Sequence, residues 1–329
     1  MKKRTIIAII AAAQLIAAPA FAQSAKPPAK PSAKAPPAKE QAAPSDANVD
    51  LAFGAFQRGY YLTAFKEATK RVDESKDPKA MTLLGELYAN GFGVKQDDMK
   101  AAEWYKLAAE RGDREAMFTL AMFRIGGRAG PKNRDEAAKL LAGASKLGHA
   151  PAAYNLALLY IEGQQFPQDY ARAAELLRIA ADAGNSEAQY ALGTFYKDGR
   201  GVQKDEREAA RLMGAAAVAG NLDAMTEYSI ALYNGTGVAR DEAGAAALLV
   251  RAAKRGSPIA QNRLARVLAS GRGLPADPAE AVKWHLISKA GGVTDLYLDE
   301  FAQKQPPNVR EAGEKAAKPW LTIIAASRS

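Results

Sequence analysis

The chain has no cysteine among its 329 residues and only two histidines. Disulfide bonds, thiolate metal sites and a cysteine nucleophile are therefore excluded. The two histidines, His149 and His285, stand far apart in the sequence, so we do not expect a histidine-based metal centre. A serine in the strand–turn–helix setting of a hydrolase is also missing. The sequence thus predicts no metal, no cofactor and no enzyme activity.

Long apolar runs are missing too, apart from one near the N-terminus. Residues 1–22 combine a charged start, an apolar stretch over 5–18 and a small-residue cleavage site, which predicts a secretory signal peptide. The apolar stretch is too short for a stable transmembrane helix, so we do not expect the exported chain to span a membrane. Export without cysteine is typical of a periplasmic protein of a Gram-negative bacterium, and this is the localisation we predict.

Concentrated charge is scarce in most of the chain. The formal net charge is +9, but residues 41–329 carry only about +3 of it. No basic run is interleaved with aromatic residues, so nucleic-acid binding is not expected. Residues 23–46 are almost wholly Ala, Pro, Lys, Ser and Gln, which predicts a disordered linker. Its lysines either keep the linker solvated or make weak contact with the anionic cell envelope.

What the chain does contain is a strict period of 36 residues. Three columns of small residues keep this step six times without slippage. They are Gly91, Gly127, Gly163, Gly199, Gly235 and Gly271; Gly112, Gly148, Gly184, Gly220, Gly256 and Gly292; and Ala80, Ala116, Ala152, Ala188, Ala224 and Ala260. The period predicts six copies of one structural unit over residues 77–292, stacked in a row.

Each unit has the pattern of two helices joined by a short loop. In the first unit Ala80, Leu84 and Leu87 keep the spacing of one helix face, and Gly91 follows where a left-handed residue ends a helix at little steric cost. Side chains able to cap the second helix recur at Asp97, Asn133, Asp169, Asp205, Asp241 and Asp277. Three units complete a capping box, with Glu136, Glu208 and Glu280. These structural explanations suffice, and we favour them over a phosphate-binding loop.

The two ends of the array depart from the unit. Residues 47–76 predict a divergent pair of capping helices. Residues 293–329 predict further capping helices: one over 294–302, a break at Pro306-Pro307, and a last helix capped by Asn308. Atypical terminal units shield the ends of a solenoid from water. The predicted fold class is therefore all-α, a solenoid of six helix–turn–helix repeats with capping helices at both ends.

The repeated motifs closely resemble the Sel1-like repeat, a relative of the tetratricopeptide repeat. The motifs in the first unit are Leu84-Gly85-Glu86-Leu87-Tyr88, Gly91-Phe92-Gly93-Val94 and Asp97, and those in the fourth are Gly193, Tyr196, Gly199-Arg200-Gly201-Val202 and Asp205. Two departures are Gln164-Gln165-Phe166, where a second loop glycine belongs, and Arg124 in the tyrosine column. The resemblance covers residues 51–292 and implies a right-handed α-solenoid that serves as an adaptor. A secreted subgroup associated with β-lactams carries paired cysteines, which this chain lacks.

A partner-binding surface is predicted on the first helices, which in the resembling families line the concave face. Positions equivalent to 82, 83 and 86 form a stripe beside the inward face, and they vary in kind while the packing columns do not. We name as the first-helix stripe Phe118, Tyr154, Asn155, Tyr190, Glu227, Arg263 and Arg266. Its aromatic residues form either a ladder that a partner contacts or a wall packed on the adjacent helix.

These observations predict a non-enzymatic periplasmic adaptor that binds a protein or peptide along the first helices and regulates an envelope signalling or cell-wall system. The alternative is binding or hydrolysis of peptidoglycan fragments or β-lactams, which requires a convergent acid pair such as Glu162 and Asp198. We interpret these two residues as solvated acids at helix ends. A third hypothesis is an envelope tether in which the linker itself does the binding.

Overall fold

The computed structural model describes residues 50–164 and 166–326. As the sequence predicts, the fold is all-α: every regular element in these two ranges is a helix, and no strand occurs in them. The predicted signal peptide and linker lie outside the described residues. Within the part of the chain that is described, no helix has both the length and the apolar character needed to cross a bilayer.

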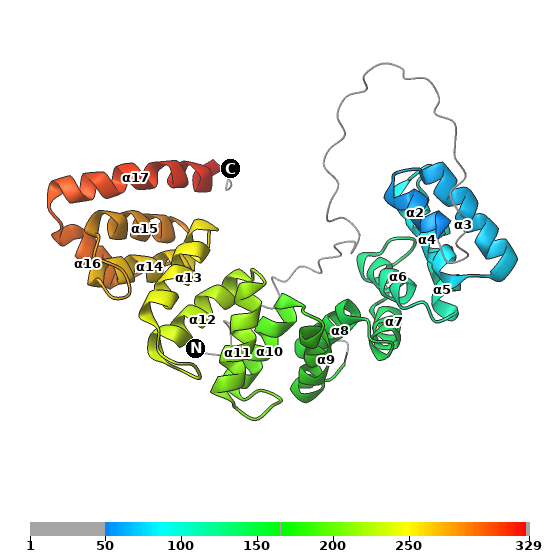
Figure 1. Ribbon diagram of the computed structural model, residues 1–329, viewed down its shortest axis with the longest axis horizontal. Coiled ribbons are helices and arrows are strands. Elements are labelled where there is room, and N and C mark those ends of the chain that lie inside the picture. The colour runs from blue at the N-terminus through cyan, green and yellow to red at the C-terminus, as the bar shows by residue number, and fades with distance from the viewer. Residues whose placement is uncertain (1–49, 165, 327–329) are drawn as a thin grey trace, which may run out of the picture. The chain divides into compact units, whose positions relative to one another are not determined.

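The chain forms two compact units that divide between Leu159 and Tyr160, inside one helix. The first unit contains α2 (Leu51–Gln57), α3 (Tyr61–Ser75), α4 (Pro78–Asn90), α5 (Asp98–Glu110), α6 (Arg114–Gly126), α7 (Arg134–Lys146) and most of α8 (Ala150–Glu162) (Figure 1). The second contains the end of α8, α9 (Tyr170–Asp182), α10 (Ser186–Asp198), α11 (Glu206–Val218), α12 (Leu222–Asn234), α13 (Glu242–Lys254), α14 (Pro258–Ser270), α15 (Pro278–Ala290), α16 (Leu296–Lys304) and α17 (Pro307–Ala326).

Each repeat is a pair of 13-residue helices, and the sequence columns explain where they start and stop. The first helix of the first repeat, α4, ends at Gly91, whose φ of +68° would strain any side chain. The second helix, α5, begins under the side chain of Asp97, which accepts a hydrogen bond from the amide of Lys100 at 3.0 Å. The same two devices recur along the array, so the predicted glycine and Asx columns are confirmed as helix caps.

A second capping column, which the sequence analysis did not identify, starts the first helices. Its side-chain oxygens or nitrogen accept from the third amide of the helix, or in the first repeat the second. Its members are Asp77, Asp113, His149, Asn185, Asn221 and Ser257. Each loop between repeats thus ends in a residue that caps the next first helix, which fixes where that helix begins.

The second loop glycines let consecutive repeats approach closely. An added Cβ at Gly201 would overlap the backbone carbonyl of Tyr170, the first residue of α9 in the preceding repeat. Gly237 and Gly273 stand in the same relation to the first residues of α11 and α13. In the second repeat the equivalent residue is Ala129, which adopts the left-handed region at φ +55°. The loop position therefore demands this backbone conformation even where glycine is absent.

The core of each unit is built mainly from alanine and leucine. In the first unit the rings of Tyr105 and Phe123 pack edge to face at 5.4 Å inside a cluster that also holds Leu84 and Leu120. Gly85 leaves room for Tyr105, because an added Cβ would lie 2.6 Å from its ring. Small residues in the helices thus set the distance between neighbouring helices, and the addition of one carbon atom disturbs their packing.

The two departures from the repeat motif have local effects only. Phe166, in the loop that lacks the second glycine, stacks on the ring of Tyr160 at 4.9 Å. Arg124, in the tyrosine column, pairs through Nε with Oε2 of Glu136 at 2.9 Å. Phe166 and Arg124 each have a contact partner of their own, and both repeats keep the two-helix structure.

The C-terminal helices continue the array as an incomplete repeat. Asp295 caps α16, so this helix begins at Leu296, two residues later than the sequence predicts. The last helix, α17, begins at Pro307 and not after an Asn308 cap, because a proline fits the first turn of a helix. Gly313 allows α17 to lie close to α15, with Val282 Cγ1 only 2.7 Å from an added Cβ. This close packing covers the end of the second unit.

Candidate functional site

In the first unit, the column of the first-helix stripe that is equivalent to position 82 packs against the following repeat. Phe118 on α6 is half-buried, and its ring centroid lies 4.7 Å from that of His149. Thr82, at the equivalent position of α4, donates from its hydroxyl to Oδ1 of Asp113 at 3.1 Å. Asp113 and His149 are the capping residues of the next first helices. This column therefore joins consecutive repeats.

The other two members of the stripe in this unit differ in exposure. Asn155 is only 8% exposed, and its Nδ2 donates to the carbonyl oxygen of Pro151 one turn earlier at 2.8 Å. It therefore offers little surface to a partner. Tyr154, its neighbour on α8, is half-buried. The partner-binding role of both residues stays a prediction.

His149 is the residue of this region that sequence reasoning placed in no role. It is 4% exposed; its Nδ1 accepts from the amide of Ala152 at 3.1 Å, and its Nε2 lies 3.2 Å from Oε2 of Glu115. Because Nδ1 accepts, Nε2 carries the proton and donates to Glu115. The hydrogen bond from His149 holds the pKa of Glu115 below its usual value, against the opposing effect of partial burial. The sequence does contain a sign of the capping role, because the residues at the equivalent positions of the other repeats are Asp, Asn and Ser, which commonly cap helices.

In the second unit, Tyr190 on α10 and Glu227 on α12 lie in a negatively charged neighbourhood. Burial, with the charges of Asp223 and Glu227, raises the pKa of the Tyr190 phenol. Partial burial and the charge of Glu227 also raise the pKa of Asp223. Lys197 balances part of this charge, because its Nζ lies 2.6 Å from Oε2 of Glu227. The stripe here combines an amphipathic ring with carboxylates that can accept hydrogen bonds.

Arg266 already has a partner within the protein. Its guanidinium on α14 donates from Nε and Nη2 to the two carboxylate oxygens of Asp295, at 2.6 and 2.7 Å. Asn262, one turn earlier, donates to Oδ2 of the same carboxylate at 2.9 Å. Burial opposes ionisation of Asp295, but the hydrogen bonds from Arg266 and Asn262 outweigh it and hold its pKa below the usual value. Arg266 therefore clamps α14 to α16, whatever else it contacts.

Arg263 stands apart from this clamp although it lies on the same helix. Its side chain is exposed, and it forms no ion pair with any of the described residues. The contact with the next capping residue is made by Thr226, which precedes Glu227 on α12 and belongs to the column equivalent to position 82. Its hydroxyl lies 3.5 Å from that of Ser257. In the second unit the stripe thus presents the exposed side chain of Arg263, while the half-buried Tyr190 and Glu227 keep part of their surface.

The chemistry of the stripe suits binding. Of the two acids considered for an enzymatic function, Asp198 has its Oδ2 3.6 Å from Nε of Arg200, and Glu162 is an exposed residue at the end of α8. In the described ranges, no group of three or more histidine or carboxylate side chains is placed to hold a metal ion. Aromatic packing, ionic contact and hydrogen bonding are what these residues provide.

Fold and surface together define a class: a helical-repeat solenoid whose units expose variable side chains on a constant framework. The chain belongs to the Sel1 repeat family, because the family model of the Sel1 repeat matches residues 78–113, 114–149, 150–185, 186–221, 222–257 and 258–293. The predicted resemblance and the six units are thereby confirmed. Sel1 repeat proteins are generally protein-interaction scaffolds, and their solenoid is typically non-enzymatic.

Two solved structures show the same architecture. A Sel1 repeat protein from Oxalobacter formigenes is similar with a TM-score of 0.61 and 28% identity, over 75% of this chain and 100% of that one. A protective antigen present in uropathogenic Escherichia coli strains, which displays an SLR fold, is similar with a TM-score of 0.58 and 22% identity, over 81% of this chain and 65% of that one. The second likeness concerns the fold alone. No curated protein sequence matches the chain.

Proposed function

We propose that this protein is a periplasmic scaffold that binds a protein or peptide partner on its first helices and thereby regulates an envelope signalling or cell-wall system. One observation carries the proposal. Tyr190, Glu227 and Arg263 stand on three successive first helices of the second unit; Arg263 is exposed, and the half-buried Tyr190 and Glu227 keep part of their surface although Glu227 also pairs with Lys197. The constant columns of the repeat serve the caps and the packing of the helices, which favours the variable positions that remain exposed, such as Arg263, as the contact surface for a partner.

The chemistry of these three residues indicates what the partner presents. Tyrosine and arginine are favoured anchors in protein interfaces, because each combines a large contact area with directed hydrogen bonds. The carboxylates around Tyr190 favour a cationic group of the partner, whereas Arg263 favours an acidic one. A peptide or helix carrying both signs of charge at a spacing of one repeat fits this surface.

The periplasmic location rests on the sequence of residues 1–22, which predicts export, and on the complete absence of cysteine. Fractionation of cells that produce the full chain with a tag tests it directly. Recovery in the periplasmic fraction, with the mass of a chain that starts at Gln23, is the expected result. Recovery in the cytoplasm at full mass would overturn the localisation without touching the binding surface.

In-cell crosslinking and pull-down test the binding surface. The full chain is compared with Tyr190→Ala/Arg263→Glu, and with Arg251→Glu as a matched control, because Arg251 is an exposed arginine on the second helix α13. Arg266 is left intact, since its loss would disturb α16. We expect a partner that the stripe variant loses and the control retains, with unchanged helical circular dichroism. Capture by all three proteins, or by none, contradicts the proposal.

A further inference from the structure

The first unit exposes three large apolar side chains where its second helices begin. Tyr60, immediately before α3, is 62% exposed; Leu62, in the first turn of α3, is 72% exposed; and Met99, in the first turn of α5, is 58% exposed. Single exposed apolar residues are ordinary, but three at equivalent ends of two neighbouring second helices form a feature. Neither the repeat packing nor the first-helix stripe accounts for them.

The loop between α4 and α5 brings these residues to one edge. Gly93 of this loop lies against the start of α3, since an added Cβ would be 3.1 Å from the backbone nitrogen of Leu62. The ring of Phe92 stacks on that of Tyr61 at 4.6 Å and fixes the loop there. The same loop then runs directly into α5. Leu62 and Met99 therefore flank one short loop, on the same end of the helix pair.

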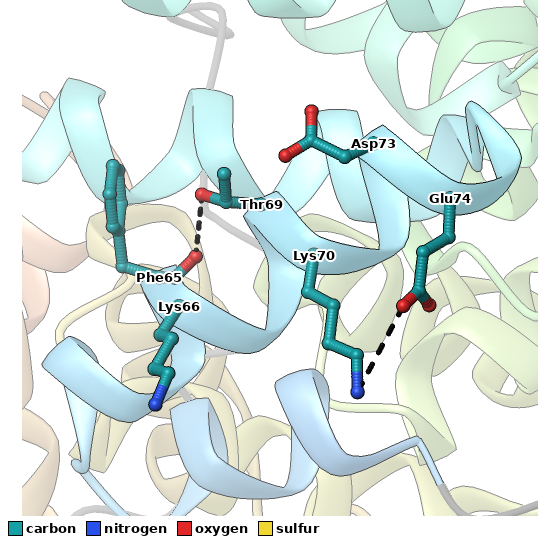
Figure 2. Close-up of a pocket in the computed structure, with 6 residues that line it drawn as sticks. All are labelled: Phe65, Lys66, Thr69, Lys70, Asp73 and Glu74. Carbon is teal, nitrogen blue, oxygen red and sulfur yellow. Dashed lines mark hydrogen bonds and ion pairs between the residues drawn. The ribbon is translucent and has the colours of Figure 1, made fainter.

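Cationic side chains surround this apolar edge. The guanidinium of Arg58 lies 6.0 Å from the ring centroid of Tyr60. Lys66 follows Leu62 by one turn of α3 and so shares its face, and Lys95 is exposed in the loop itself. In Figure 2, Lys66 and Lys70 extend to the same side of α3. Lys66 thus carries the basic charge on from the helix start, whereas Lys70 is paired with Glu74, its Nζ 4.0 Å from Oε1.

Most of the acidic groups nearby are already engaged. Asp97 caps α5 and lies 3.9 Å from Nζ of Lys100, and Asp98 pairs with Arg128 at 2.5 Å. The hydrogen bond from Arg128 holds the pKa of Asp98 below its usual value, so this carboxylate stays paired. Glu103, one turn after Met99, is an exposed acid of this edge. The balance of charge that faces solvent beside the apolar residues remains positive.

We propose that this N-terminal edge, composed of Tyr60, Leu62 and Met99 with Arg58, Lys66 and Lys95, binds the surface of an anionic lipid bilayer. The apolar side chains project from helix starts, and a tyrosine ring is favoured at the level of the head groups. Shallow insertion alone is weak, and lysine and arginine near an anionic surface add to it. The edge also stands next in sequence to the lysine-rich segment 23–46, whose charge has the same sign.

Vesicle co-sedimentation tests this inference. Residues 23–329 are mixed with vesicles of phosphatidylcholine and phosphatidylglycerol, or of phosphatidylcholine alone. We expect binding to the anionic vesicles, weakened by salt. In Leu62→Glu/Met99→Glu the partition constant should fall at least about tenfold, because each change removes an inserted apolar group and adds a repelled charge. Both residues are exposed, so circular dichroism should remain that of the parent.

Three further variants decide where the binding resides. Val218→Glu and Leu296→Glu make the same type of change at side chains that are 83% and 80% exposed in the second unit, and both should bind as the parent does. A variant with Lys26, Lys30, Lys34 and Lys39 changed to Ser tests the linker. The inference is overturned if the parent does not sediment with anionic vesicles, if the controls lose as much as Leu62→Glu/Met99→Glu, or if only the linker variant loses binding.

Discussion

Two loop glycines allow two reasons for glycine to be measured separately: the left-handed backbone and the close approach of another repeat. Gly201 and Gly184 both have left-handed backbones, with φ of +63° and +87°. An added Cβ at Gly184 meets no atom within 4 Å, whereas at Gly201 it overlaps the carbonyl carbon and oxygen of Tyr170 in the preceding repeat. Substitution by alanine therefore imposes similar backbone strain at both positions, but a steric clash at Gly201 alone.

The expected losses of stability follow from these two effects. A left-handed backbone costs a non-glycine residue roughly 1–2 kcal/mol, and the stiffer unfolded chain returns about 0.4–1 kcal/mol. Gly184→Ala should therefore lower the free energy of unfolding by about 1 kcal/mol. For Gly201→Ala the clash involves backbone atoms that cannot rotate away, and such overpacking adds about 1–3 kcal/mol. The total expected for Gly201→Ala is about 2–4 kcal/mol.

Urea unfolding followed by far-ultraviolet circular dichroism measures both changes. Because repeats can unfold in parts, limited proteolysis should accompany it, and the first cleavage in Gly201→Ala should fall near the junction of α9 with the loop after α10. Equal losses for the two variants would refute the reasoning, since they would mean that the close approach of the repeats is not what requires glycine. A larger loss for Gly184→Ala would refute it as well.

Two more predictions concern ionic contacts. Arg266→Ala should lower the free energy of unfolding by about 2 kcal/mol, because it strands the buried carboxylate of Asp295 while the arginine itself is partly solvated; Arg263→Ala, the exposed control, should stay within about 0.5 kcal/mol, and equal urea midpoints for both would contradict the clamp. Acid should weaken the Asp98–Arg128 contact: the hydrogen bond from Arg128 lowers the folded-state pKa of Asp98, so its contribution is complete above the unfolded value of about 3.9 and disappears as the pH falls through the folded value. The urea midpoints of the parent and Asp98→Asn should therefore differ by a constant gap from about pH 7 to about pH 4 and converge only at lower pH, and a gap that persists under strongly acidic conditions would count against this contact.

The repeat architecture could be predicted because each device that makes it is local. Gly91 ends a helix and Asp97 starts the next one through contacts within a few residues, so the column itself reveals the function of the residue. The close approach of Gly201 to Tyr170 could not be predicted in the same way, because the two residues belong to different repeats. Ala129 shows what the column of loop glycines could not predict: its backbone is left-handed, although alanine gives no indication of this conformation in the sequence.

The binding stripe could be predicted only in part, for a related reason. Arg266 has the pattern of a free cation at the end of a column, and its partner Asp295 lies in the incomplete last repeat, two residues out of register with the other capping residues. Periodicity therefore gave no reason to pair them. Arg263, three residues away, has the same sequence pattern and remains exposed. Distinguishing the two required the position of α16.

The column equivalent to position 82 shows why variability alone does not identify a binding surface. Its residues change from repeat to repeat, but so do the capping residues they touch: Thr82 meets Asp113, Phe118 meets His149, Thr226 meets Ser257, and Asn262 meets Asp295. A hydroxyl or amide meets a polar cap, and a ring meets a ring. This variation is matched within the chain and needs no external partner. Arg263 and Glu227, in the neighbouring column, vary without a matched change in a capping residue. A surface read by another protein should be sought at such unmatched positions, and the Arg263→Glu variant is therefore the most direct test of the scaffold function.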